Sequence, residues 1–259
     1  MVARVLDVQS RELSPCPAER ALALVARGQA ELVSREPLTV RLLRAVDIPA
    51  PQPQRPPLAG QRLLLHVCCA PCATYSARRL QEQGAEVTAF WYNPNVHPYS
   101  EHERRRTSLA RYAAEVGLPV EWEPGYDMVT FFRRVAGHER PGERCALCYE
   151  LRLERTARRA AELGMDAICT TLLISPYQDQ ALIHQVGLAA AARHGVAFYF
   201  ENLRRGFAEH HRLAREHGLY RQSYCGCVYS EWEALLKRGH SPATASGSTP
   251  AEETPLADP

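Results

Sequence analysis

The chain has 259 residues, 46% of them hydrophobic, and a formal net charge of +2 at pH 7. Such values are ordinary for a globular protein with a sizeable core, built as one large domain or two smaller ones. No stretch approaches the length of a membrane span, and the first residues lack the charged-then-apolar pattern of a signal peptide, so we expect a cytoplasmic protein without membrane contact. The nine cysteines favour metal binding or redox chemistry, because structural disulfides are rare in the cytosol.

Residues 1–47 have the pattern of a small α+β module of their own. A short strand is followed by a turn at Ser14-Pro15, a helix over about Ala18–Arg27 and two further short strands. Residues 48–60 are rich in proline, which excludes helix and central strand, and we interpret them as a linker. Residues 240–259 combine Pro, Ser, Thr and acidic residues without apolar periodicity, so we expect a disordered tail.

The main domain is expected over residues 61–239, where short apolar runs alternate with longer helical patterns. The predicted strands are Leu63–Val67, Glu86–Tyr92, Val120–Trp122, Ala167–Ile174 and Val196–Glu201. The predicted helices are Ala73–Gln83, Ser100–Val116, Asp127–Ala136, Ala146–Leu163, Gln178–His194 and Gly206–His217. Strands that alternate with helices of this length are typical of crossover units. The predicted fold class is therefore α/β, with a mainly parallel, Rossmann-like sheet flanked by helices, in addition to the small N-terminal module.

Unusual segments follow three of the predicted strands. They are CCAPC at 68–72 after the first strand, NPNVHP at 93–98 after the second and SPYQD at 175–179 after the fourth. In parallel sheets, ligands bind beyond the carboxyl ends of the strands. The positions of these segments therefore favour one site at that edge of the sheet.

Two cysteine pairs stand far apart in the chain. Cys68 and Cys69 close a predicted strand, and Cys145 and Cys148 open a predicted helix, whose N-terminus lowers the pKa of a thiol. The two pairs converge if the fold brings those ends together. Four such thiolates suit a soft metal or an iron–sulfur cluster. Cys72 supplies a further thiol one turn after Cys68 and Cys69. A closed tetrahedral zinc site is one alternative. The other is that these cysteines bind nothing and are small buried residues of the core.

A third cysteine motif, Cys225-Gly226-Cys227, stands near the end of the main domain. A disulfide between these cysteines would close a small ring, and the strain in it would make the disulfide easy to reduce, as labile or catalytic disulfides are. Gly226 relieves the constraint on the backbone between them. We interpret the motif as a redox-active dithiol. Two further metal ligands or two inert thiols are the alternatives.

Polar side chains are dense beside these motifs. The candidates for binding a polar substrate are Asn93, Asn95, His97, Asp179, Tyr220, Arg221 and Tyr224. Turn chemistry alone explains an Asn-Pro-Asn segment, so a structural role competes with binding. Two groups of arginines are interpreted mainly as solvated helix faces, with phosphate contacts as the alternative. They are Arg104, Arg105, Arg106, Arg152, Arg155, Arg158 and Arg159.

Five blocks of the main domain stand in a characteristic order. They are HVCCAPC, FWYNPNVHPYSEHERR, ERCALCYELRLERTA, TTLLISPYQD and YRQSYCGCVYS, spread over residues 62–233. Together they resemble the signature blocks of the QueH epoxyqueuosine reductases. The resemblance implies a cobalamin-independent enzyme that reduces the epoxide of epoxyqueuosine, at the wobble position of tRNA, to queuosine.

The resemblance also implies cofactors and site residues. It implies a [4Fe–4S] cluster on Cys68, Cys69, Cys145 and Cys148, and a redox-active pair at Cys225 and Cys227. For some members it implies a second iron, for which Cys72 is the candidate ligand. An electron donor must serve the reaction. Trp91, Tyr92 and Tyr177 are aromatic candidates to stack on the modified base once it has turned out of the anticodon loop, with core packing as the alternative.

Other functions compete with this one. A zinc-stabilised nucleic-acid-binding module and a general thiol–disulfide oxidoreductase both use clustered thiols. Residues 1–47 resemble, through short motifs, the module that precedes HNH-type endonuclease domains. No HNH signature follows, so at most an accessory contact with nucleic acid is implied.

Overall fold

The computed structural model describes residues 2–10, 12–43 and 58–239. The chain divides into two compact units, Met1–Gln54 and Arg55–Pro259, each with its own sheet. The predicted tail at 240–259 and most of the predicted linker at 48–60 lie outside the described residues. Within the described residues, no helix is long and apolar enough to cross a membrane.

The described residues of the N-terminal unit form a four-stranded sheet with one helix. Its elements are β1 (Val2–Leu6), β2 (Glu12–Pro17), α1 (Ala18–Ala26), β3 (Ala30–Arg35) and β4 (Leu38–Leu42). The strand order is β2-β1-β4-β3, with β1 and β4 parallel and the outer pairs antiparallel. The predicted turn at Ser14-Pro15 is wrong, because β2 runs through both residues. This strand is at an edge, where a proline is tolerated since its missing N–H leaves no ladder bond unmade.

The second unit contains a parallel sheet whose five described strands stand in the order β7-β6-β5-β8-β9. They are β5 (Arg62–His66), β6 (Glu86–Trp91), β7 (Val120–Trp122), β8 (Ala167–Thr170) and β9 (Ala197–Phe198). Leu63, Leu64 and Leu65 of the central strand β5 are fully buried, because helices cover both faces of the sheet. This burial on both faces is why the strand is a continuous apolar run in the sequence. The α/β class with a parallel, Rossmann-like sheet is confirmed.

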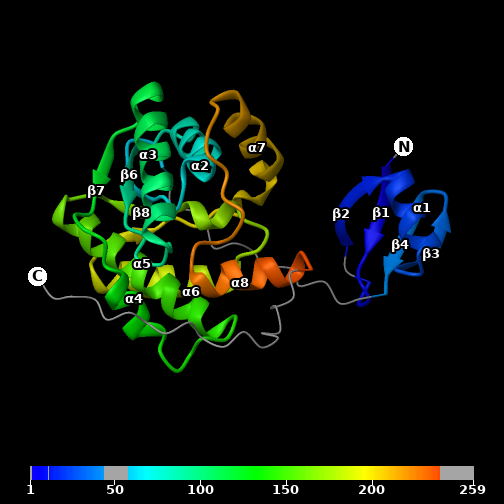
Figure 1. Cartoon of the computed structure of the whole chain (residues 1–259). Coiled ribbons are helices and arrows are strands. Elements are labelled where there is room, and N and C mark those ends of the chain that lie inside the picture. Colours follow the sequence, from blue (N-terminus) through cyan, green and yellow to red (C-terminus); the bar gives the residue numbers. More distant parts are fainter. Residues whose placement is uncertain (1, 11, 44–57, 240–259) are drawn as a thin grey trace, which may run out of the picture. The chain divides into compact units, whose positions relative to one another are not determined.

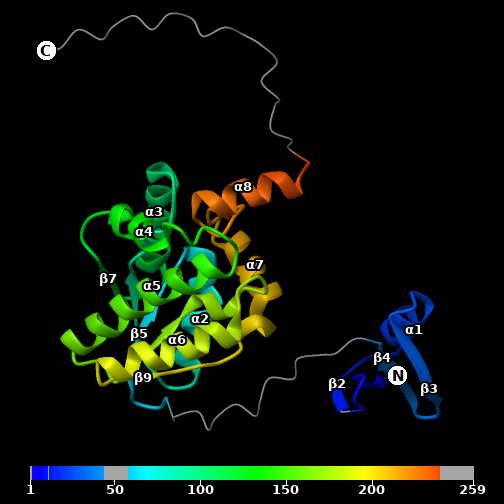
Figure 2. The same cartoon turned by 90° about the horizontal axis from the view of Figure 1, so that it is seen from below.

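Helices cover both faces of this sheet (Figure 1). One layer consists of α2 (Ala70–Glu82), α3 (Tyr99–Val116) and α7 (Phe207–Glu216). The other layer consists of α5 (Glu143–Glu162) and α6 (Gln180–Arg193), and α4 (Met128–Val135) packs against α5. The last described helix, α8 (Val228–Lys237), follows the Cys-Gly-Cys motif and is seen beside α4 and α5 in Figures 1 and 2.

Three predictions about the elements need correction. The predicted strand Val196–Glu201 is too long, since β9 covers only Ala197–Phe198. The predicted strand Ala167–Ile174 is too long, since β8 ends at Thr170 and a 3-10 turn, η1 (Thr171–Ile174), follows. The Oγ1 atom of Thr170 accepts a hydrogen bond from the Leu172 N–H at 3.2 Å, which caps the turn and ends the strand. Helix α8 is absent from the predicted elements. Its apolar residues Val228, Tyr229, Trp232, Leu235 and Leu236 do have helical spacing, which is the sequence signal that could have found it, although none of its residues is fully buried.

The strand order reverses between β5 and β8. From β5 the chain adds β6 and β7 on one side, and it then returns to add β8 and β9 on the other side. At such a reversal, α/β proteins bind ligands beyond the carboxyl ends of the strands. Cys68 follows β5 at this point and Thr171 follows β8, so the CCAPC segment lies at the switch point of the sheet.

Candidate metal–thiolate site

Three buried thiols meet directly after β5. Cys68 and Cys69 follow the strand, and Cys72 lies in the first turn of α2. The three sulfur atoms lie within 4.8 Å of one another, and those of Cys68 and Cys69 are 3.8 Å apart. Neighbouring residues of a strand point to opposite faces. Here the strand has already ended and the helix begins at Ala70, so the turn aims adjacent cysteines at one point.

These three thiols hold their protons unequally. Hydrogen bonds from Cys69 and Cys72, with a further one from Thr171, hold the pKa of Cys68 well below its usual value, and the same sharing raises the pKa of Cys72 well above it. The hydroxyl of Thr171 donates to the sulfur of Cys68 at 3.3 Å and accepts from the Cys68 N–H at 3.1 Å. The group therefore carries one negative charge readily and resists a second until a cation binds. Thiolates prefer soft cations.

The second cysteine pair lies at the start of α5. Cys148 is buried and Cys145 is half-buried, and Cys145 packs against the hydrophobic cluster that contains the CCAPC thiols. Burial raises the pKa of Cys148 to about 12, Arg152 opposes this, and the thiols of Cys225, Cys227 and Cys145 add to it. Among the described residues, the compact group within 4.8 Å consists of the three CCAPC thiols and does not include this pair. A four-iron cluster has one thiolate on each iron, so its ligands are spread more widely than those of a single ion.

The Cys-Gly-Cys motif presents one exposed and one buried thiol. Cys227 is buried and is the N-cap of α8, where its sulfur accepts from the Ser230 N–H at 3.4 Å. Cys225 is exposed, and its sulfur accepts from the side-chain amide of Gln178 at 3.5 Å. The side-chain amide of Gln222 in turn donates to the sulfur of Cys69 at 3.0 Å. The motif thus lies beside the thiol cluster, with residue Cys225 at the surface and its thiol directed inward, where burial raises its pKa.

The NPNVHP segment after β6 is tied to the Cys-Gly-Cys motif through its backbone. The His97 N–H donates to the carbonyl of Gly226 at 2.8 Å, and the hydroxyl of Tyr224 donates to the carbonyl of His97. Asn93, Asn95 and His97 are all buried. Burial lowers the pKa of His97 to about 4, so its ring is neutral near pH 7. The amide of Asn93 donates to the Val67 carbonyl at 2.8 Å, which fastens the segment to the end of β5.

A buried ion pair on α3 fixes the backbone of the Cys-Gly-Cys motif. The Arg105 guanidinium donates to the carbonyl of Cys225 at 2.8 Å, to the carbonyl of Tyr224 at 3.2 Å and to the Glu101 carboxylate at 2.8 Å. The Tyr220 hydroxyl donates to the same carboxylate at 2.7 Å. Tyr220 and Tyr224 therefore have structural partners in the fold, besides any contact with substrate.

The remaining candidates lie nearer the surface. Asp179 caps α6, since its carboxylate accepts from the Leu182 N–H at 3.0 Å. Arg221 is exposed, and Tyr177, next to Gln178, is 85% exposed. Trp91 and Tyr92 are instead buried.

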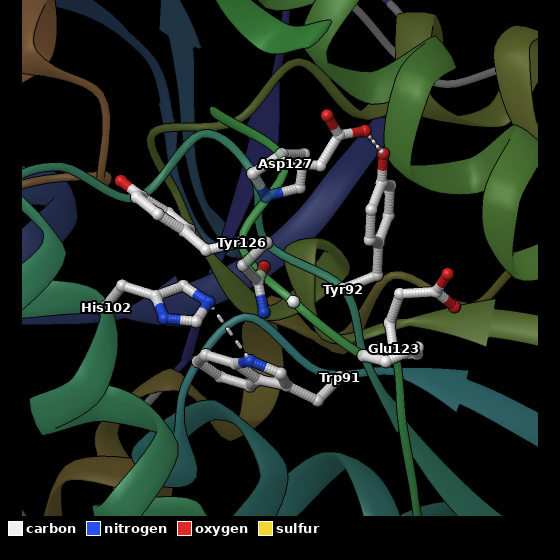
Figure 3. A pocket seen from close by; sticks show the side chains of 10 residues that line it. Trp91, Tyr92, His102, Glu123, Tyr126 and Asp127 are labelled. Carbon is white, nitrogen blue, oxygen red and sulfur yellow. Dashed lines mark hydrogen bonds between the residues drawn. The ribbon is translucent and has the colours of Figure 1, made fainter. Parts of the chain in front are cut away.

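Figure 3 shows Trp91 and Tyr92 in the wall of a small pocket, with Trp91 donating to His102 and Tyr92 to Asp127. This pocket has a volume of about 10 Å³, which is room for a single water. A nucleobase does not fit there. Tyr92 also lines a second pocket of about 210 Å³, together with Leu151 and Arg155, and Tyr177 is exposed.

The interpretation of the arginines as solvated faces is wrong for two of them. Arg105 and Arg152 are each 1% exposed, whereas the others lie at or near the surface beside acidic partners. On α5, Arg152 belongs to the buried stripe of Cys148, Tyr149, Leu153 and Thr156. The helical period of that stripe is the sequence signal that places Arg152 inside.

The fold and the site together define a class: a parallel α/β protein with a buried cluster of thiols, which could hold a soft metal, at its switch point and a Cys-Gly-Cys pair beside it. A family model described as epoxyqueuosine reductase QueH matches residues 63–233. A relative from Dehalococcoides mccartyi, named epoxyqueuosine reductase QueH, is 40% identical over 182 residues, which cover 70% of this chain and 98% of that protein. A relative of the same name from Thermotoga maritima is 36% identical over 192 residues, which cover 69% of this chain and 98% of that one. The chain belongs to the epoxyqueuosine reductase QueH family, and the resemblance noted in its motifs is confirmed.

Proposed function

We propose that this chain reduces the epoxide of epoxyqueuosine in tRNA to the alkene of queuosine. Membership of the family supports the reaction. The observation that carries the proposal is the position of the buried thiols of Cys68, Cys69 and Cys72 at the switch point, beside the exposed Cys225. The substrate is tRNA with the modified base at the wobble position, and we place the reaction in the cytoplasm, where tRNA is used.

The donor set fits a [4Fe–4S] cluster. The compact group consists of thiols without a carboxylate, which favours a soft metal over a hard cation such as magnesium. The residues that would hold the cluster are Cys68, Cys69, Cys145 and Cys148, and Cys72 is the candidate ligand of a further iron. When bound, such a cluster supplies electrons one at a time.

The two thiols of the Cys-Gly-Cys motif match the number of electrons that the reaction needs. Conversion of an epoxide to an alkene consumes two electrons and two protons, breaks both C–O bonds and releases the oxygen as water. Oxidation of the Cys225 and Cys227 thiols to a disulfide releases two electrons and two protons. An external electron donor then reduces the disulfide, which lies close to the surface because residue Cys225 is exposed.

The chain's own residues organise this step. Arg105 holds the carbonyls on the N-terminal side of Gly226, and the His97 N–H holds the carbonyl of Gly226 itself. The substrate contacts are proposed among the polar residues around the motif: Asn93, Asn95, His97, Asp179, Tyr220, Arg221 and Tyr224. The small pocket of Figure 3 admits no base. Since Tyr177 is exposed and adjoins Gln178, which donates to Cys225, we propose that the base approaches beside Tyr177 and Cys225.

The test is anaerobic incubation of the purified protein with tRNA that carries epoxyqueuosine, followed by mass analysis of the nucleosides. The expected result is loss of one oxygen atom from the modified base in the presence of a reductant. A protein that binds zinc tightly, has no visible cluster absorbance and leaves the epoxide intact would overturn the proposal. A protein that reduces small disulfides but ignores this tRNA would also contradict it.

A further inference from the structure

Arg152 is a fully buried cation that has no carboxylate partner among the residues that the structure describes. It lies on α5, one helical turn after Cys148, and is 1% exposed. Its Nε atom donates to the carbonyl of Cys148 at 3.3 Å, and its Nη2 atom has no hydrogen-bond partner within the described part of the chain.

The two other buried arginines around the thiols differ in this respect. Arg105 pairs with Glu101 at 2.8 Å, and Arg144 pairs with Glu233 at 2.6 Å. Each of these charges is compensated by an acidic side chain. No ion pair found among the described residues includes Arg152.

A guanidinium keeps its charge at every pH that proteins tolerate, so Arg152 cannot become neutral to escape its surroundings. A buried charge is strongly unfavourable unless an opposite charge lies nearby. The groups whose charge reaches Arg152 are the sulfur atoms of Cys148, Cys225 and Cys68, together with the Tyr149 hydroxyl. Sulfur is therefore the group that can compensate this charge, once it is present as metal-bound thiolate.

The position of Arg152 relates it to all three cysteine motifs. Cys148 belongs to α5, Cys68 follows β5, and Cys225 precedes α8. His66, at the end of β5, also faces this cation, and its pKa is lowered to about 3, first by burial and then by Arg152. His66 is neutral near pH 7 and does not compensate the charge.

We propose that Arg152 is the counter-cation of the metal–thiolate centre and raises its reduction potential. The proposal rests on the proposed function, because it requires the centre to be present. A thiolate-bound cluster becomes more negative when it gains an electron, so a fixed positive charge nearby favours the reduced form. Arg152 is thus a positioning residue that acts through the centre and does not touch the substrate.

The test compares the midpoint potential of the cluster in the wild-type protein and in three variants, by redox titration followed by electron paramagnetic resonance. Arg152→Gln removes the charge and keeps most of the volume, and Arg152→Lys keeps the charge. Arg159→Gln is the matched control, since Arg159 lies two turns further along α5 and pairs with Glu121 at the surface. We expect a more negative potential in Arg152→Gln, a potential near the wild-type value in Arg152→Lys, and no change in Arg159→Gln.

A wild-type potential in Arg152→Gln, or an equal shift in Arg159→Gln, would overturn the inference. If Arg152→Gln takes up too little cluster to titrate, the rate at which a chelator removes iron is the second measurement. Faster iron loss from Arg152→Gln than from Arg152→Lys and Arg159→Gln supports the inference, and equal rates contradict it. If the wild-type protein reduces the epoxide while these variants behave alike, only this inference fails. A wild-type protein without a cluster overturns the proposed function as well.

Discussion

Gly226, between the two cysteines of the Cys-Gly-Cys motif, is a position where one methyl group has a large expected effect. Its φ angle is +152°, in a region that residues with a side chain rarely adopt. A Cβ atom at this position would lie 3.0 Å from the amide nitrogen of Asn95, 3.1 Å from Cγ2 of Val96 and 3.4 Å from Nη1 of Arg105. The substitution Gly226→Ala therefore adds backbone strain and overpacking together.

The magnitude follows from these two effects. Backbone strain of this kind costs about 1–3 kcal/mol, and forcing a methyl group into packed surroundings costs about 1–3 kcal/mol. Part of the strain relaxes by movement of the loop, which then weakens the bonds from His97 and Arg105 to its carbonyls. We expect Gly226→Ala to lower the free energy of unfolding by about 2–4 kcal/mol and to impair epoxide reduction.

The assay is urea unfolding followed by tryptophan fluorescence, which reports on the second unit because Trp91, Trp122 and Trp232 all belong to it. Gly137→Ala is the matched control. Gly137 has a φ of +82°, and an added Cβ there meets nothing within 4 Å, so we expect a loss of only about 1 kcal/mol. The reasoning is refuted if Gly226→Ala destabilises the protein no more than Gly137→Ala.

Three further predictions concern the dithiol, the buried ion pair and acid. Cys225→Ser should keep the cluster absorbance and lose epoxide reduction, and full turnover with a physiological donor would disprove the dithiol role. Arg105→Gln should lower the free energy of unfolding by about 3–5 kcal/mol, because it removes the close cation of the buried Glu101 carboxylate and leaves it the Tyr220 hydroxyl and Arg104 at 3.9 Å. The double variant with Glu101→Gln should recover part of this loss in a double-mutant cycle. Burial lowers the pKa of His210 to about 4, from a value near 6.5 in the unfolded chain. The stability that comes from keeping His210 neutral is therefore complete above pH 6.5. It is lost as the pH falls towards 4, by up to about 1.4 kcal/mol per pH unit. His210→Gln should flatten the fall in urea stability between pH 6.5 and 5, and an unchanged slope would contradict the assignment.

Local patterns predict the sheet and the edge where the site lies. The apolar run before Cys68 and the alternation of strands with helices are local signals, and both lead to a parallel sheet with CCAPC at its carboxyl edge. The end of β8 is less predictable, because Thr171–Ile174 is as apolar as a strand and the hydroxyl of Thr170 caps a turn instead.

Local sequence patterns do not predict contacts between segments that are far apart in the chain. The bond from Tyr224 to His97 joins residues 127 positions apart, and the bond from Arg105 to the Cys225 carbonyl joins residues 120 positions apart. Nothing local distinguishes Arg105 or Arg152 from their solvated neighbours except helical phase, since both stand on the buried stripe of their helix. Charge pattern alone misassigns them, because buried cations are rare in helices.

The central claim is that cysteines from the end of β5 and from the start of α5 serve one metal–thiolate centre. It is tested most directly by iron and sulfide content and the electron paramagnetic resonance signal of the reduced protein in Cys68→Ala, Cys148→Ala and Cys169→Ala. Cys169 is a matched control, since it is equally buried but lies within β8. We predict that the first two variants lose the same signal and that Cys169→Ala keeps it. A wild-type signal and iron content in Cys148→Ala would contradict the claim.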